Sequence, residues 1–240
     1  MRFSRTRLLV GEEGLGRLRQ ATVAVIGLGG VGSFAFEALV RAGVGRLVVI
    51  DGDCVESSNI NRQLLALDST VGRPKVEVAK ERAAQINPYA VITPIQQCLT
   101  PDNLDAVLPN HLDAAIDAID SLDAKVHLIM TLRKRNTHFV SCMGAALRRH
   151  ATRVRVDDIS RTKGCPLARA VRRRLRSRGI ASGVPCVFSV EQPEPRRETG
   201  SAHPPAVSGE RRDLGSLSYV PGIIGLTAAG LVINDLVSMA

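Results

Sequence analysis

A glycine-rich turn constrains the fold of this chain more than any other feature of its sequence: Gly27-Leu28-Gly29-Gly30-Val31-Gly32. The turn follows an apolar segment, residues 22–26, that is typical of a buried strand, and it opens a helical pattern over residues 30–42. Glycines at such a turn let the backbone approach a phosphate group, and the helix N-terminus offers N–H donors and a positive dipole. We therefore expect a unit that binds a nucleotide.

Strand and helix patterns alternate up to about residue 142, which predicts an α/β fold. We expect a Rossmann-like, mainly parallel sheet with helices on both faces, extended by later antiparallel strands. The predicted strands cover residues 22–26, 46–50, 90–94, 114–119, 138–142, 151–156 and 185–190. The predicted helices cover residues 12–20, 30–42, 74–87, 104–108, 121–136, 166–178 and 222–239.

We expect the 240 residues to form a single domain with four parts. These parts are a nucleotide-binding core (1–145), a basic segment (146–190), a mobile loop rich in Pro, Arg, Ser and Gly (191–215) and a C-terminal core helix (216–240). The apolar stretch 220–233 is shorter than the ~20 residues that span a bilayer and contains Pro221. We interpret it as a buried helix and expect no membrane association.

Positive charge is concentrated in one segment of the chain. The net charge is +9, whereas residues 148–178 alone carry eleven arginines and one lysine against two aspartates, a net +10. Within the predicted helix 166–178, four arginines fall on one face at a spacing that suits a phosphate backbone: Arg169, Arg172, Arg173 and Arg176. Because arginine outnumbers lysine 27 to 5 in the whole chain, a solvated helix face explains the same pattern.

The five cysteines are odd in number and include no CxxC pair. This usage argues against a disulfide framework and against a four-cysteine zinc site. We therefore expect no zinc and a cytoplasmic protein.

Polar residues after the predicted strands help to distinguish a dinucleotide from a nucleoside triphosphate as the ligand. Asp51 and Asp53 follow the second strand, where an acid can bind ribose hydroxyls. A dinucleotide needs no further cation, whereas a triphosphate needs cations for its leaving pyrophosphate and a carboxylate for magnesium. Arg62, Lys75 and Asp120 supply these groups. Taken singly, surface solvation explains the two cations, and a charge at a helix N-terminus explains Asp120.

Together these motifs resemble the superfamily of ubiquitin-activating-like adenylyltransferases over about residues 2–145. The matching segments are 27–32, 51–53, 59–63, 72–75 and 117–121. The opening residues 2–11, the run Ile86-Asn87-Pro88, the arginine-rich stretch 164–178 and residues 186–189 and 215–222 are similar to one branch, the tRNA threonylcarbamoyladenosine dehydratases. That resemblance extends over nearly the whole chain.

The resemblance implies that ATP adenylates the threonine carboxylate of threonylcarbamoyladenosine in a tRNA anticodon loop, after which the side chain cyclises and one water is lost. It also implies roles for particular residues. The glycines Gly27, Gly29, Gly30 and Gly32 with Asp51, Asp53, Asn59 and Gln63 would bind ATP, Arg62 and Lys75 would hold the phosphates, and Asp120 would hold Mg²⁺. Arg5 would reach the site of the second subunit of a homodimer. The basic segment would bind tRNA.

Two alternative functions remain open at this point. A sulfur-carrier adenylyltransferase would use the same AMP chemistry on a small protein, although such enzymes commonly carry two CxxC pairs. A non-catalytic adenine-nucleotide-binding or NAD-binding module explains the glycine-rich turn but leaves Arg62, Lys75 and Asp120 without a role. The sequence also leaves open a monovalent cation site and a sulfur-relay partner, for which no motif speaks.

Overall fold

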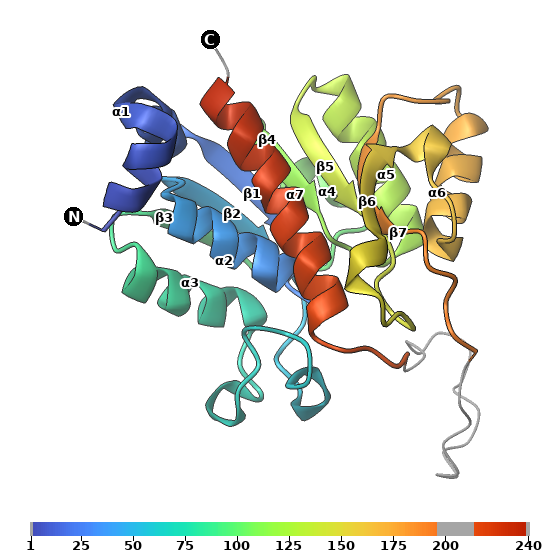
Figure 1. Cartoon of the computed structure of the whole chain (residues 1–240), viewed down its shortest axis with the longest axis horizontal. Coiled ribbons are helices and arrows are strands. Elements are labelled where there is room, and N and C mark those ends of the chain that lie inside the picture. The colour runs from blue at the N-terminus through green and yellow to red at the C-terminus, as the bar shows by residue number, and fades with distance from the viewer. Residues whose placement is uncertain (1, 196–213, 239–240) are drawn as a thin grey trace.

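The computed structural model describes residues 2–195 and 214–238, and its strands form one sheet of order β3-β2-β1-β4-β5-β7-β6 (Figure 1). Neighbouring strands are parallel except for the last pair, β7 and β6, which is antiparallel. The expected Rossmann-like, mainly parallel sheet is therefore confirmed. The strands are β1 (Thr22–Ile26), β2 (Arg46–Ile50), β3 (Val91–Ile95), β4 (Ala114–Asp117), β5 (His138–Cys142), β6 (Val154–Asp158) and β7 (Pro185–Ser189).

Helices cover both faces of the sheet. Residues of α1, α2, α3 and α7 join one buried apolar cluster, and residues of α4, α5 and α6 join the other. Successive side chains of a strand point to opposite faces, so β1 and β2 contribute alternate residues to the two clusters. The helices are α1 (Ser4–Gln20), α2 (Gly32–Ala42), α3 (Lys75–Ile86), α4 (Leu104–Val107), α5 (Leu122–Lys134), α6 (Pro166–Arg176) and α7 (Tyr219–Ser238).

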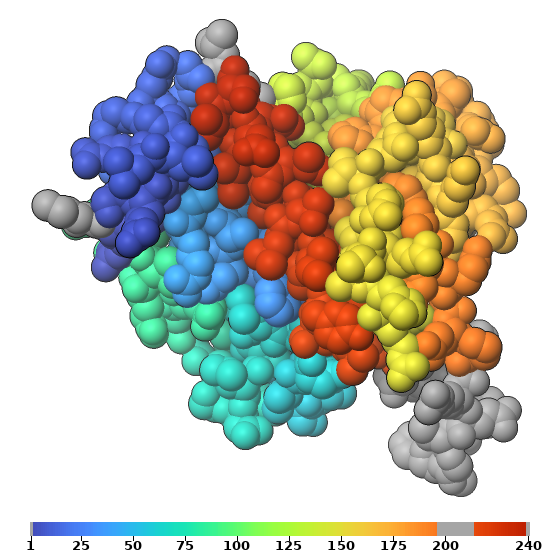
Figure 2. All heavy atoms as spheres, viewed as in Figure 1, coloured from blue at the N-terminus to red at the C-terminus, as the bar shows by residue number. Residues whose placement is uncertain are grey.

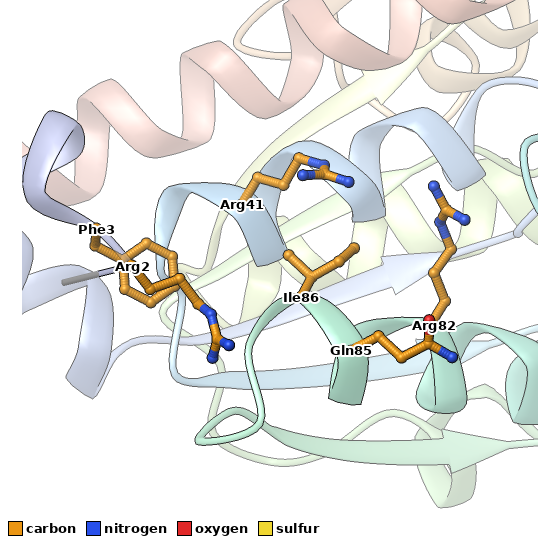
Figure 3. Close-up of a pocket in the computed structure, with 6 residues that line it drawn as sticks. All are labelled: Arg2, Phe3, Arg41, Arg82, Gln85 and Ile86. Atoms are coloured by element: carbon orange, nitrogen blue, oxygen red, sulfur yellow. The ribbon is translucent and has the colours of Figure 1, made fainter.

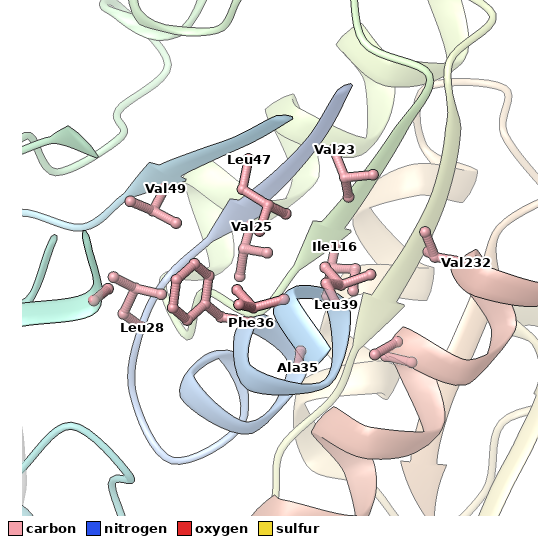
Figure 4. Close-up of a cluster of buried hydrophobic side chains, with 14 of the residues drawn as sticks. Val23, Val25, Leu28, Ala35, Phe36, Leu39, Leu47, Val49, Ile116 and Val232 are labelled. Atoms are coloured by element: carbon pink, nitrogen blue, oxygen red, sulfur yellow. The ribbon is translucent and has the colours of Figure 1, made fainter. Parts of the chain in front are cut away.

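The core that positions the glycine-rich turn lies between β1, β2, β4 and the helix α2. Phe36 and Leu39 of α2 are fully buried against Val25 and Ile116 of the sheet (Figure 4). Leu28, the second residue of the turn, is also buried in this cluster. The start of α2 is thereby held at the carboxyl end of β1, where a nucleotide crevice occurs in open α/β sheets.

The helix α7 lies along the outside of the α2 face and crosses from α1 towards β6 (Figures 1 and 2). Within the described part of the chain it is the helix that is long and apolar enough to cross a membrane, and half of its most apolar stretch is buried in the protein. The buried side includes Ile224, Ala228 and Val232, which pack in the same cluster as α2. This burial agrees with the predicted core helix.

Several element boundaries differ from the sequence predictions. The first helix begins at Ser4 rather than near residue 12 and is kinked at Gly11, which has φ +76°. The sixth strand begins at Val154 because residues 151–153 form a 3₁₀ turn. The predicted mobile loop 191–215 lies mostly outside the described residues, as does residue 239 of the predicted last helix.

The contact between α7 and α2 depends on a missing side chain. A Cβ atom added to Gly225 would lie 2.2 Å from the carbonyl oxygen of Val31, whereas one added to Gly230 of the same helix would meet no atom within 4 Å. Gly225→Ala should therefore destabilise the protein by about 1–3 kcal/mol through overpacking. Gly230→Ala should stabilise it by up to about 1 kcal/mol through helix propensity. Urea unfolding measures both, and equal effects would contradict this packing.

Candidate nucleotide-binding site

The turn between β1 and α2 is built from two close backbone approaches. Gly27 has φ +89°, and its N–H donates to the carbonyl of Ile50 over 2.8 Å. A Cβ atom on Gly32 would lie 1.7 Å from the carbonyl oxygen of Gly27, and one on Gly27 would lie 2.8 Å from that of Ala118. No side chain fits at either position, so the turn brings bare backbone to the carboxyl edge of the sheet.

Asp51 braces this turn from the end of β2. Its Oδ2 accepts a hydrogen bond from the N–H of Leu28 at 2.6 Å, and its Oδ1 accepts one from the N–H of Asp53 at 2.8 Å. A carboxylate oxygen accepts more than one hydrogen bond, so Asp51 retains capacity for two ribose hydroxyls beside the turn. The structure thus brings Asp51 and the glycines together, as the sequence predicts.

Lys75 is buried and paired. Its side chain is 5% exposed, and its Nζ lies 3.0 Å from Oδ2 of Asp53. The interpretation of Lys75 as a solvated surface residue is therefore wrong. An ammonium group that is removed from water needs a neighbouring anion, and Asp53 supplies it. The ion pair thereby joins the segment after β2 to Lys75, the first residue of α3.

Residues 59–64 form the wall opposite the glycines. Cβ atoms placed on Gly30 and Gly29 would lie 3.4 Å from the carbonyl oxygen of Arg62 and 4.0 Å from Nε2 of Gln63. Asn59 is buried, and its Oδ1 accepts from the N–H of Glu56 at 3.2 Å, which closes the 3₁₀ turn Ser57–Asn59. This wall places Arg62 and the amide of Gln63 beside the glycine-rich turn, and Nη1 of Arg62 donates to the carbonyl of Ser58 at 2.8 Å and to Oδ1 of Asn61 at 2.9 Å.

A buried ion pair beneath the turn escaped the sequence reasoning. Lys125 Nζ donates to Oδ1 of Asp117 at 2.7 Å, both side chains are 0% exposed, and the hydroxyl of Ser141 donates to Oδ2 at 2.6 Å. Asp117 Oδ1 also accepts from the N–H of Ile119 at 3.3 Å. The group therefore fixes residues 118–119, against which Gly27 packs. The sequence contains one indication of this buried pair: Lys125 lies on the same face of α5 as the apolar residues 128, 129 and 132.

Asp120 lies three residues beyond Asp117 and is exposed at the same edge of the sheet, just before α5. An exposed carboxylate here suits Mg²⁺, which keeps most of its waters and takes one or two protein carboxylates together with substrate phosphates. The donor set of this edge therefore fits ATP with Mg²⁺.

Arg5 is not at this edge of its own chain. It is exposed on α1, and its neighbours Ser4 and Arg7 line a groove together with Gly43 and Gly45, which precede β2. Those residues mark the amino edge of the sheet, the edge opposite the glycine-rich turn. Within one chain, Arg5 and the turn are therefore not brought together.

The arginines of α6 divide into two kinds. Arg169, Arg173 and Arg176 are exposed, whereas Nη1 of Arg172 donates to the carbonyl of Ile159 at 3.2 Å and to that of Thr162 at 2.9 Å. Nη1 of Arg172 thus anchors α6 to the preceding 3₁₀ turn, and the contact of Arg172 with tRNA stays a prediction. The start of α6 lies near Gly144, just beyond β5, at the same edge as the turn.

Two cysteines at this side of the sheet are neutral thiols. Burial raises the pKa of Cys142 to about 12 and raises that of Cys186 as well, so neither forms a thiolate near neutral pH. Cys165 is buried too, and its Sγ accepts a hydrogen bond from the N–H of Ala168 as the N-cap of α6. These three side chains fill the core and cap a helix.

The fold and the turn define a Rossmann-like protein with a site for nucleotide phosphates. A profile of the ThiF family matches residues 3–239, and the chain belongs to that family. It is 42% identical over 239 residues to the tRNA threonylcarbamoyladenosine dehydratase of Bacillus subtilis (strain 168), covering 98% of this chain and 94% of that protein. The molybdopterin-synthase adenylyltransferase of Salmonella typhimurium is 38% identical but covers 62% of this chain and 59% of its own length.

A solved structure is similar over the same extent. The tRNA N6-threonylcarbamoyladenosine dehydratase of E. coli in complex with ATP superposes with a TM-score of 0.86 at 35% identity, covering 98% of this chain and 93% of that one. The similarity thus includes the basic segment and α7 as well as the nucleotide-binding core.

Removing one member of the buried ion pair should strongly destabilise the protein. Asp117→Asn leaves the ammonium group of Lys125 in the interior without a counter-charge, and such a loss costs about 3–5 kcal/mol. As a control, Asp105→Asn removes a carboxylate that is 86% exposed in its pair with Arg135 and should leave stability near that of the wild type. Urea unfolding at pH 7 measures both, and similar midpoints for the two variants would refute the structural importance of Asp117.

Proposed function

We propose that this protein is an ATP-dependent tRNA threonylcarbamoyladenosine dehydratase. The observation that carries the proposal is a phosphate-binding turn flanked by Arg62 and Gln63, in a chain that aligns nearly end to end with such an enzyme. The likeness to a sulfur-carrier-type adenylyltransferase covers a much shorter part of the chain. The dehydratase function also gives a role to the basic segment.

In the proposed reaction, a threonine carboxylate oxygen attacks the α-phosphorus of ATP and pyrophosphate leaves. The carbamoyl group then attacks the activated acyl carbon, a proton is lost and AMP departs, so one water is removed in total. In the first step the threonine carboxylate and the triphosphate, both anions, must approach each other. Arg62 and Lys75 offset their repulsion and the charge that develops on pyrophosphate. Mg²⁺ held by Asp120 would neutralise further phosphate charge when it is bound.

The chain's remaining contribution is positional. Asp51 would orient the ribose, the glycines and Asn59 would shape the phosphate site, and Gln63 would lie beside it. Holding the two substrates in a reactive geometry can supply most of the rate enhancement, and no protein nucleophile is required.

The proposal includes a homodimer in the cytoplasm. Arg5 lies at the amino edge of its own sheet, so it acts on ATP only when a second subunit delivers it to the other edge. All five cysteines are free thiols, which favours a reducing compartment. The size-exclusion mass of the purified protein measures the dimer directly.

Mass spectrometry of nucleosides tests the activity. Incubation of tRNA that carries threonylcarbamoyladenosine with the protein, ATP and Mg²⁺ should lower the mass of that nucleoside by one water, and only when ATP is present. Arg62→Ala should slow this conversion by about 10²–10³-fold, the loss typical of one transition-state donor. Lys80→Ala, an exposed change on α3, is the matched control and should retain full activity. Unchanged nucleoside mass with ATP bound would reject the proposal.

The exposed arginines of α6 should contact the tRNA backbone. The triple change Arg169→Ala, Arg173→Ala and Arg176→Ala should weaken tRNA binding and reduce the slope of log K against log salt concentration by about 2–3. Arg172→Ala should instead lower thermal stability, because it frees two carbonyl groups. Filter binding at several salt concentrations and a melting curve separate the two effects. Wild-type tRNA affinity in the triple variant would exclude α6 from the interface.

A further inference from the structure

The outer side of α7 carries a stripe of apolar residues along the whole helix. The inner side, which includes Ile224, Ala228 and Val232, is buried in the cluster that α2 joins. The outer side lies at the surface (Figure 2). Six of its residues, which we call the α7 stripe, are exposed or partly exposed: Tyr219, Ile223, Leu226, Gly230, Ile233 and Val237. A helix that is apolar on both sides is typically covered on both.

The spacing of the α7 stripe is typical of two helices that pack lengthwise. Its residues recur at alternating steps of four and three, the 3.5-residue period that keeps a row of side chains facing a partner helix. The stripe is also symmetric about position 228, which lies midway between residues 226 and 230, 223 and 233, and 219 and 237. A second copy of α7 that runs in the opposite direction therefore sets each stripe residue against another stripe residue.

The central pair of the stripe is complementary in size. Leu226 is 49% exposed, and a Cβ atom added to Gly230 would meet no atom of the described residues within 4 Å. When two copies of the helix run antiparallel, Leu226 of each copy lies against Gly230 of the other. A large side chain thus enters the space that a missing side chain leaves, as a knob enters a hole in helix packing.

The two ends of α7 lie at opposite edges of the sheet. Near its start, the Cβ atom of Pro221 lies 3.4 Å from a Cβ atom placed on Gly30 of the glycine-rich turn. Near its end, the carbonyl of Val237 accepts a hydrogen bond from Arg17 of α1. The 20 residues between span about 30 Å. Antiparallel pairing therefore brings α1 of one copy towards the glycine-rich turn of the other.

The segment that carries Arg5 continues the apolar surface. Leu8 and Leu9 follow Arg5 at i+3 and i+4, on the same face of α1, and they are 82% and 88% exposed. The preceding residue Phe3 holds this segment at the amino edge, where it lines a cavity of about 460 Å³ with Ile86 of α3 (Figure 3). A second copy that covers the two leucines receives Arg5 at the same surface.

We propose that two copies of this chain associate through antiparallel pairing of their α7 stripes, about a two-fold axis near residue 228. The inference rests on the proposed function, which requires Arg5 from a second subunit. A two-fold axis makes the contacts reciprocal, so each copy delivers its Arg5 to the nucleotide site of the other. A lipid surface or an unrelated apolar partner would cover the stripe but would use neither its symmetry nor the leucines beside Arg5.

Substitutions in the stripe and beside Arg5 test the pairing. Leu226→Asp puts a charge at the centre of the interface, and the two-fold axis repeats it, so the dissociation constant of the dimer should rise at least about hundredfold. The double change Leu8→Asp and Leu9→Asp should raise it about tenfold or more, because buried apolar surface is lost. The control, Ala106→Asp, adds a charge at an exposed position of α4 on the other face of the sheet and should leave the dimer intact.

Sedimentation velocity at several protein concentrations measures the dissociation constant, and a melting curve checks that each variant is folded. The expected result is a wild-type dimer that Leu226→Asp converts to a folded monomer. A wild-type monomer at every concentration would overturn the proposal, as would a folded Leu226→Asp variant that dimerises like the wild type. If Leu226→Asp does not fold, the leucine double decides in the same way, since its side chains are almost fully exposed in the single chain.

The measurement needs neither ATP nor tRNA, so the interface and the proposed reaction can fail separately. Conversion of the nucleoside by a wild-type monomer would leave the proposed reaction standing and remove the interface. A dimer that Leu226→Asp breaks, without any conversion by the wild type, would do the reverse.

Discussion

The phosphate-binding turn depends on two places where backbone meets backbone without a side chain between. Gly32 lies against the carbonyl of Gly27, and Gly27 lies against the carbonyl of Ala118. The second approach works only if residue 118 stays where it is, and the buried pair Asp117–Lys125 holds it there through the N–H of Ile119. A buried ion pair in the core thus supports the nucleotide site, because it holds the backbone on which the turn packs. Such pairs are expensive to bury, and precise placement of a loop is a reason to keep one.

The two edges of the sheet carry different sets of polar groups. Its carboxyl edge carries the glycines, Asp51 and Lys75 beside the turn, and residues 59–64 form the opposite wall. Its amino edge is lined by six arginines, four of which are paired with Glu12 or Glu37. The exposed face of α6 begins near the carboxyl edge, at the same edge of the sheet as the glycine-rich turn.

Much of the fold was predictable because local patterns are strong where strands are buried on both sides. Residues 22–26, 46–50 and 138–142 were predicted with the observed bounds. Asp51 and the glycines also come together as expected, since strand ends and turn chemistry place them. Tertiary contacts explain what the sequence does not show. Arg172 shares a helix face with exposed arginines, but its Nη1 binds carbonyl groups at the 3₁₀ turn that precedes α6. The Asp117–Lys125 pair was missed because a single buried charge does not alter an apolar periodicity.

In the proposed reaction, this edge of the sheet activates a carboxylate by adenylation. The most direct measurement uses tRNA in which the threonine carboxylate of threonylcarbamoyladenosine is labelled with ¹⁸O, followed by mass spectrometry of the nucleotide products. Attack on the α-phosphorus transfers one carboxylate oxygen to the phosphate, so adenylation should give AMP that carries a single ¹⁸O, with unlabelled pyrophosphate. Formation of ADP with labelled inorganic phosphate, or of AMP without label, would contradict it.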